Sequence, residues 1–226
     1  MLIAIDIETI PNIDMIDKLP EPSIDARLKD PAKIADAKAG AKQKQIDGMA
    51  LDALTARVCC YGCVGLVAPT HEGEQEHGEI IAAATDDEER KLIHSIMNML
   101  GTGDVRIVTF NGINFDLPMI YKRAMILGID PGNFGAPPLS AWTKRYSTDR
   151  HYDLMQIWGG WSTQGWEKLE TIARLVLGET RADIPYEQVP DLIKTEAGRT
   201  AVLDGCINHT RLAWQLWKRF NGTLFA

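Results

Sequence analysis

Two acidic residues interrupt the apolar segment that opens this sequence. Residues 1–9 read MLIAIDIET, a β-branched run typical of a strand, in which Asp6 and Glu8 are two positions apart. Side chains alternate along a strand, so both carboxylates point to the same face. Adjacent buried carboxylates repel each other unless a cation neutralises them, and hard divalent ions prefer oxygen ligands. The pattern favours a metal site over the simpler interpretation of two solvated acids at a sheet edge.

A third acid, Asp116, follows another strand-like segment at residues 106–110. That segment runs into Asn111 and Gly112, and a helix with an apolar face begins near residue 117. An Asp at the start of a helix is usually a cap. Together with the pair in the first strand, it becomes a candidate third ligand.

The two acidic segments resemble motifs of a known enzyme family. Residues 6–9 (DIET) are similar to the first motif of the DEDD-type 3′–5′ exonucleases, and residues 111–116 (NGINFD) are similar to the second. The likeness covers most of the chain and is greatest to stand-alone phage and bacterial relatives of the proofreading domain of family-B DNA polymerases. It implies a ribonuclease-H-like fold and hydrolysis of single-stranded DNA 3′ ends by two Mg²⁺ or Mn²⁺ ions.

The resemblance also implies a role for each matched residue. Asp6 would bridge both ions, Glu8 would bind the ion beside the attacking water, and Asp116 would hold the other ion. Three residues are expected near the substrate, namely Thr9, Asn111 and Phe115. For Phe115, packing beneath the sheet is an equally good interpretation, because aromatic side chains are readily buried.

This sequence departs from the third motif of the family. Family members carry an Asp four positions before a Thr on the last helix, and a Tyr or His upstream of that Asp orients the water. Counting back from Thr210 gives Cys206, and Val202 stands where the Tyr would be. The nearest acid, Asp204, lies two positions away, which on a helix is a rotation of about 200°. The neighbouring His209 is expected to be structural, so the general base has no candidate in the sequence.

Three interpretations of the third motif stay open. Asp204 could be the fourth ligand in a shifted register, or three acids could hold the metal and work poorly, or Cys206 could replace the Asp in a disabled protein. A thiolate ligand is the least favoured, because thiolates suit zinc better than magnesium.

Strands and helices alternate in the rest of the sequence. We expect strands at residues 57–67, 79–84 and 106–110, a turn at 71–78, and helices at 32–50, 86–101, 117–127, 166–177 and 199–220. Asp153 is expected to hold a loop by hydrogen bonding. The order predicts a single α/β domain over residues 1–226, with a mixed sheet flanked by helices and a helical insertion at about 12–52.

Composition limits the classes of protein further. The 226 residues carry 24 Lys and Arg against 31 Asp and Glu, a net charge of −7, and no apolar run long enough for a membrane span. A globally basic DNA-binding surface is therefore excluded, and local cations would have to guide a strand. The candidates are the basic residues of segment 27–44 with Lys122, Arg123, Lys144 and Arg145. The four cysteines, Cys59, Cys60, Cys63 and Cys206, are expected to be buried thiols.

These observations predict a metal-dependent 3′–5′ exodeoxyribonuclease in the cytoplasm of a bacterium or a phage-infected host, with replication or repair proteins as possible partners. The alternative is a weakened or inactive module that binds nucleic-acid ends, since the fourth acid falls on Cys206. A third class is an α/β interaction protein whose acids are ordinary surface residues.

Overall fold

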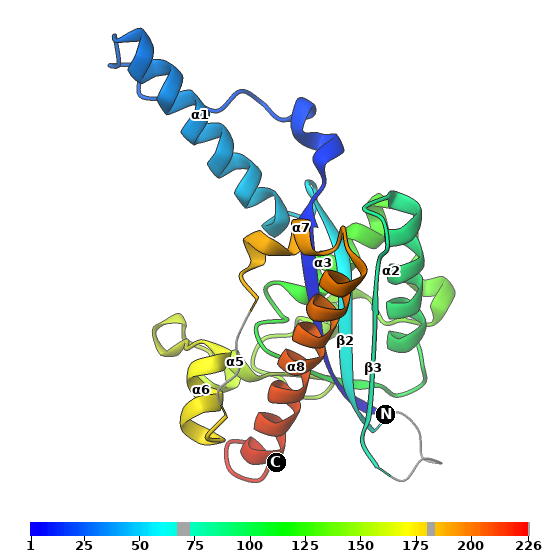
Figure 1. The fold of residues 1–226 in the computed structure, drawn as a ribbon. Helices are drawn as coiled ribbons and strands as arrows, with labels where there is room; N and C mark the ends of the chain where they lie inside the picture. Colours follow the sequence, from blue (N-terminus) through cyan, green and yellow to red (C-terminus); the bar gives the residue numbers. More distant parts are fainter. Residues whose placement is uncertain (67–72, 180–183, 226) are drawn as a thin grey trace.

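The computed structural model describes residues 1–66, 73–179 and 184–225. Its centre is a five-stranded sheet in the order β3-β2-β1-β4-β5 (Figure 1). The strands are β1 (Leu2–Pro11), β2 (Ala56–Leu66), β3 (Gln75–Ile80), β4 (Arg106–Thr109) and β5 (His151–Asp153). The helices are α1 (Pro31–Gly48), α2 (Asp86–Leu100), α3 (Asp116–Ile126), α4 (Leu139–Trp142), α5 (Leu154–Trp158), α6 (Leu169–Val176), α7 (Val189–Leu192) and α8 (Glu196–Phe220). Short 3₁₀ helices are η1 (Ile13–Lys18), η2 (Met49–Leu51), η3 (Pro131–Phe134), η4 (Thr163–Gly165) and η5 (Tyr186–Gln188).

The sheet is mixed, which confirms the predicted fold class. β1 pairs antiparallel with β2 and parallel with β4, and β4 pairs parallel with β5. The third strand begins at Gln75, four residues before the predicted strand, because its pairing with β2 starts at Gly65 opposite Gln75. The last residue of the predicted strand 57–67 and the first two residues of the predicted turn 71–78 lie outside the described residues.

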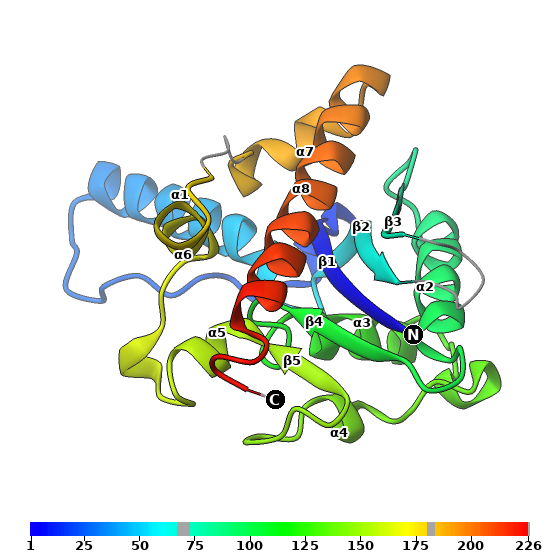
Figure 2. The ribbon, with the colours of Figure 1, turned by 90° about the horizontal axis from the view of Figure 1, so that it is seen from below.

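Helices cover both faces of the sheet (Figures 1 and 2). Ile3, Ile5 and Ile7 of β1 join the core that contains the apolar faces of α2 and α3. Leu2 and Ala4, on the opposite face, join a second core with the carboxyl half of α8. By the alternation of side chains, Asp6 and Glu8 continue the α8 face of the strand.

A glycine lets α8 lie directly against this face. Gly62 of β2 is paired with Asp6 of β1. A Cβ at Gly62 would lie 2.9 Å from Thr210 Oγ1 and 3.1 Å from the Cys206 carbonyl carbon. The missing side chain therefore sets how closely the middle of α8 approaches Asp6.

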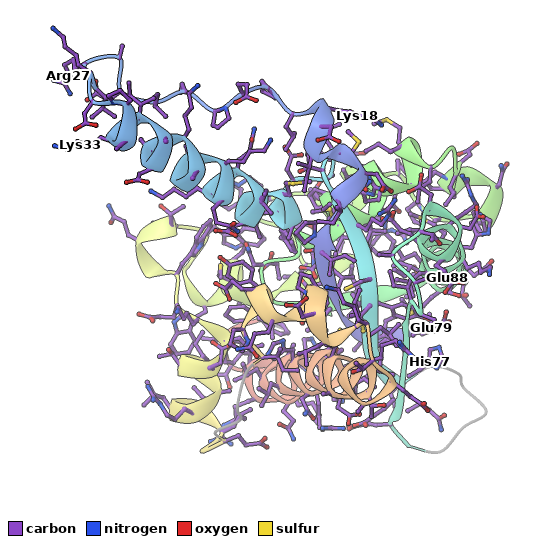
Figure 3. The ribbon with its side chains drawn as sticks, turned by 45° about the horizontal axis from the view of Figure 1, so that its top comes forward. Lys18, Arg27, Lys33, His77, Glu79 and Glu88 are labelled. Carbon is purple, nitrogen blue, oxygen red and sulfur yellow. The ribbon has the colours of Figure 1, made fainter. Side chains whose placement is uncertain are left out.

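The segment between β1 and β2 contains η1, α1 and η2, where the sequence predicts a helical insertion. Helix α1 has no buried residue and projects from the body of the molecule (Figure 1). Arg27 and Lys33 lie at its outer end, as Figure 3 shows. The Arg27 guanidinium binds the Asp25 carboxylate with a shortest N···O distance of 2.8 Å.

The remaining local predictions concern caps, cysteines and membrane segments. The Thr85 hydroxyl accepts a hydrogen bond from the Glu88 N–H and begins α2, as the capping pattern predicts. All four cysteines are free and buried. Within the described residues, no helix combines the length and apolar character needed to cross a bilayer.

The contact at Gly62 can be tested by adding one methyl group. We expect Gly62→Ala to lower the free energy of unfolding by about 1–3 kcal/mol, because the added Cβ forces α8 away from the sheet. Urea unfolding followed by circular dichroism would measure the change.

Gly40→Ala is the matched control, because Gly40 lies in α1 with no atom within 4 Å of an added Cβ. Alanine there should stabilise the helix by about 0.5–1 kcal/mol. Equal effects of the two substitutions would contradict the packing argument.

Candidate active site

A cavity of about 290 Å³ opens where the predicted motifs meet. Its lining residues are Asp6, Ile7, Glu8, Phe110, Asn111, Phe115, Asp116, Ile184, Pro185, Tyr186 and His209. β1 supplies Asp6, Ile7 and Glu8. The turn after β4 and the first residue of α3 supply the next four lining residues, and residues 184–186 together with α8 supply the rest. The structure thus brings the two predicted motifs together with two elements from the carboxyl-terminal quarter of the chain.

His209 of α8 faces the carboxylates of β1. Its Nδ1 lies 3.6 Å from Asp6 Oδ2 and 3.8 Å from Glu8 Oε1. One ligand atom from each of these three residues lies within 4.8 Å of the other two. The sequence predicts a structural role for His209, and the structure places its side chain in the lining of the acidic cavity.

Cys206 lies one helical turn from His209 and also faces Asp6. Its Sγ donates to the Asp6 carbonyl oxygen at 3.5 Å and lies 3.8 Å from Asp6 Oδ2. The thiol is fully buried, and burial raises its pKa well above the usual range, so that it remains protonated. The position that the third motif assigns to an acid is thus beside Asp6 and holds a neutral thiol.

Two predicted site residues lie elsewhere. Helix α8 runs without a break through Gly205, so Asp204 keeps the rotation that separates it from Cys206; it is exposed and is not among the described residues that line the cavity. Thr9 is buried, and its hydroxyl donates to the Ala50 carbonyl at 2.7 Å. Thr9 therefore anchors η2 to β1 instead of facing the cavity.

Asp116 is the most buried of the three matched acids. It begins α3, and its Oδ1 has no hydrogen-bond partner among the described residues. Burial raises the pKa of Asp116 well above its usual range, and the nearby charge of Asp6 raises it further. An orphaned, buried carboxylate oxygen beside a second carboxylate is the arrangement that a bound cation would neutralise.

Asp153 fixes the turn that carries Asn111. Its Oδ1 accepts the Asn111 N–H at 3.1 Å, and its Oδ2 accepts the Ile113 N–H at 2.9 Å. The same Oδ1 also caps α5 through the N–H groups of Met155 and Gln156. Asp153 therefore holds a loop by hydrogen bonding, as expected, and the loop is the one that lines the cavity.

One of the candidate strand-guiding cations is not at the surface. Arg123 is buried, and its guanidinium forms two hydrogen bonds of 2.8 and 2.6 Å with the buried Glu89 carboxylate. It also donates to the Ala53 carbonyl at 3.0 Å. Arg123 therefore ties α3 to α2, whereas Lys122, Lys144 and Arg145 are exposed.

Comparison with known proteins identifies the family of this chain. Residues 53–222 match the model of a family described as predicted 3′–5′ exonucleases related to the exonuclease domain of PolB. The chain belongs to this family. The matched region contains the Asp116 motif and α8, and the DIET segment of β1 precedes it.

Relatives of this exonuclease-family chain include DNA polymerases. It is 25% identical to a DNA polymerase of Thermococcus litoralis over 183 residues, which is 66% of this chain and 11% of the polymerase. It is 24% identical to a DNA polymerase of Thermococcus aggregans over 182 residues, which is 66% of this chain and 10% of the polymerase. The chain thus spans about a tenth of the length of these relatives.

The fold has a counterpart among solved structures. The family B DNA polymerase from the archaeon Pyrobaculum calidifontis superposes with a TM-score of 0.61 and 17% identity. The similarity covers 97% of this chain and 24% of the polymerase chain. It supports the ribonuclease-H-like α/β arrangement expected from the resemblance.

Two residues of the cavity lining have almost no signal in the sequence. Tyr186 follows a proline in a polar segment, and His209 lies outside the matched motifs. Its position three residues after Cys206, on the same side of a helix, was the only available indication. Both residues enter the site through tertiary contacts.

Removal of the Asp116 charge gives a test that needs no substrate. We expect Asp116→Asn to raise the free energy of unfolding at neutral pH in EDTA by about 1–3 kcal/mol. A carboxyl group whose pKa is raised by burial destabilises the fold at any pH above its unfolded pKa, and the amide removes this cost. We expect Mn²⁺ to raise the thermal midpoint of the wild type, and this increase should be lost in the variant. Thermal unfolding with EDTA or Mn²⁺ measures both effects.

Asp36→Asn provides the control, since it makes the same chemical change at an exposed position of α1. It should alter neither the stability in EDTA nor the response to Mn²⁺. A full Mn²⁺ response in Asp116→Asn would show that Asp116 does not contribute to a metal site.

Proposed function

We propose that this chain is a metal-dependent 3′–5′ exonuclease that removes nucleotides from single-stranded DNA ends. The observation that carries the proposal is the convergence of Asp6, Glu8, Asp116 and His209 on one cavity. These residues come from three distant parts of the sequence, and the family to which the chain belongs is one of predicted 3′–5′ exonucleases.

The residues present fit divalent cations. Asp6, Glu8 and His209 offer three ligand atoms in mutual reach, and Asp116 offers the oxygen that lacks a partner among the described residues. Carboxylates suit Mg²⁺ and Mn²⁺, and the imidazole favours Mn²⁺ of the two. Two bound ions would polarise the phosphodiester and stabilise both the attacking and the leaving oxygen.

Other groups of the chain would bind and orient the strand end. Phe115 and Tyr186 place aromatic rings in the cavity lining, where they can contact the terminal nucleoside. Asn111 is held in a left-handed conformation, with φ of 72°, by its backbone hydrogen bond to Asp153. The backbone at Asn111 is therefore fixed in position where the residue lines the cavity.

The substitution at Cys206 supports a second candidate, an end-binding module with weak or absent turnover. The thiol is neutral and buried beside Asp6. It therefore adds no negative charge where the family pattern has an acid. In this alternative the protein binds DNA 3′ ends in the presence of metal but hydrolyses them slowly or not at all.

Hydrolysis itself is tested with a 5′-labelled oligonucleotide and either Mg²⁺ or Mn²⁺. We expect a ladder of products shortened from the 3′ end, faster with Mn²⁺, and loss of at least about a hundredfold in rate for Asp6→Asn. Asp204→Asn is the matched control and should retain the wild-type rate. No shortening with either metal would reject the enzyme, and binding of the oligonucleotide without shortening would support the alternative.

Restoring the acid separates the two candidates. In the alternative, Cys206→Asp should raise the rate by about tenfold or more, because a fourth carboxylate then helps to hold the ions. If His209 already serves as the fourth ligand, Cys206→Asp should change the rate little and His209→Ala should abolish it.

Cys206→Asn controls for the change of volume, since it is nearly isosteric with the Asp variant and uncharged. Thermal unfolding of both variants shows whether the helix contact survives. Unchanged activity in Cys206→Asp combined with loss of activity in Asp204→Ala would contradict both readings and support the shifted register.

A further inference from the structure

Three non-glycine residues in the described part of the chain have a left-handed backbone. They are Asn111 in the cavity, with φ of 72°, and Tyr146 and Trp161, with φ of 60° and 62°. A positive φ is uncommon for any side chain and is an outlier for a bulky aromatic one. Such conformations cost free energy and gather at functional sites.

Tyr146 and Trp161 also contact each other at the surface. Their ring centroids are 5.4 Å apart with an angle of 47° between the planes. Tyr146 is 73% exposed and Trp161 is partly exposed, so little of the cost of the two conformations is recovered by burial in the core. Packing alone therefore does not explain why both rings are held here.

Arg145 lies beside this pair, and two further cations are near it in the sequence. Of these, Lys144 binds Asp149 at 3.3 Å and Arg150 lies 3.7 Å from Asp104. The Arg145 guanidinium carbon lies 6.0 Å from the centre of the Tyr146 ring, a cation–π distance. Residues 144–150 carry Lys144, Arg145 and Arg150 against Asp149, a local excess of positive charge in a chain of net charge −7. Aromatic rings combined with cations are the usual equipment for holding single-stranded nucleic acid.

Hydrogen bonds from the Trp161 backbone lead to the candidate active site. The Trp161 N–H donates to the Gln156 carbonyl at 2.8 Å, and the Gln156 N–H donates to Asp153 Oδ1 at 3.2 Å. Asp153 is also the residue that fixes the turn of Asn111. Helix α5, which makes this link, lies beside α8 on the same side as α6 in both ribbon views (Figures 1 and 2).

From these observations, and resting on the function proposed above, we propose that Arg145, Tyr146 and Trp161 form a stacking platform for unpaired bases. The platform holds the strand on the 5′ side of the 3′ end that enters the cavity. The exposed rings stack on bases, and Arg145 with Lys144 faces the backbone phosphates. Because paired bases hide their faces, the platform selects single strands over duplex.

Binding is measured by fluorescence anisotropy at fixed salt, with Ca²⁺ in place of Mg²⁺ and a gel to verify that the strand stays intact. The probe is a 5′-fluorescein oligothymidylate of about twelve nucleotides, within the length that such surfaces cover. Tyr146→Ala and Trp161→Ala should each weaken binding about tenfold, the loss typical of one stacked base.

Conservative variants distinguish stacking from simple apolar contact and from misfolding. Tyr146→Phe keeps the ring and should bind as the wild type does, whereas Tyr146→Leu should bind as weakly as the alanine variant. Met125→Ala, which removes a 71% exposed apolar side chain of α3, should leave binding unchanged. Wild-type binding by Tyr146→Leu, or no measurable binding by the wild type, would overturn the platform.

Abasic substitutions in the oligonucleotide locate the stacked base. One or two internal abasic positions should weaken wild-type binding about tenfold and have no effect on a Tyr146→Ala, Trp161→Ala double variant. Equal losses in both proteins would overturn the platform.

The platform and the exonuclease fail in different ways. If the wild type shortens the strand with Mg²⁺ or Mn²⁺ but the platform variants bind normally, the platform alone is rejected. If the wild type binds single strands through the platform but never shortens them, the exonuclease alone is rejected.

Discussion

Repulsion between carboxylates confined to one cavity is the constraint on which the rest of this structure depends. β1 carries Asp6 and Glu8 on a single face, and the start of α3 brings the buried Asp116 beside them. Water is too scarce there to screen the charges fully, as the raised pKa of Asp116 indicates. Packing elsewhere in the fold must therefore offset the repulsion between these acids. A cation that bound the site would stabilise the folded state.

Two contacts outside the cavity hold the elements that carry these residues in place. The absence of a side chain at Gly62 lets α8 lie against the sheet, and the helix then brings Cys206 and His209 to the carboxylates. On the other side, Asp153 binds the turn before α3 and the start of α5 with one carboxylate. Rigid elements rather than long flexible loops thus position the candidate ligands, which is what preorganised chemistry requires.

The third motif, where this chain departs from the pattern that the resemblance implies, lies on α8. The thiol of Cys206 occupies the place expected for an acid, and the imidazole of His209 stands one turn further along the helix. A neutral thiol at one position and an imidazole at the next turn lower the negative charge of the cavity and add a nitrogen donor to it. The same helix otherwise keeps its role as the layer that covers the sheet.

The sequence by itself determined the strand with its paired acids, the helix that begins at Asp116, the mixed sheet and the buried cysteines, because each depends on local periodicity or on a short motif. Only the tertiary structure decided which residues meet. A helical or strand pattern predicts the face on which a residue lies and does not identify its neighbours. Such patterns predict a structural role for His209, a surface position for Arg123 and a substrate contact for Thr9. The structure places His209 in the cavity lining and buries the other two elsewhere. The buried pair of Arg123 with Glu89 and the approach of α8 over Gly62 join residues far apart in the chain. The contact of Tyr146 with Trp161 forms only after β5 and α5 fold back between them. Such contacts follow from the packing of layers, which no spacing along the sequence encodes.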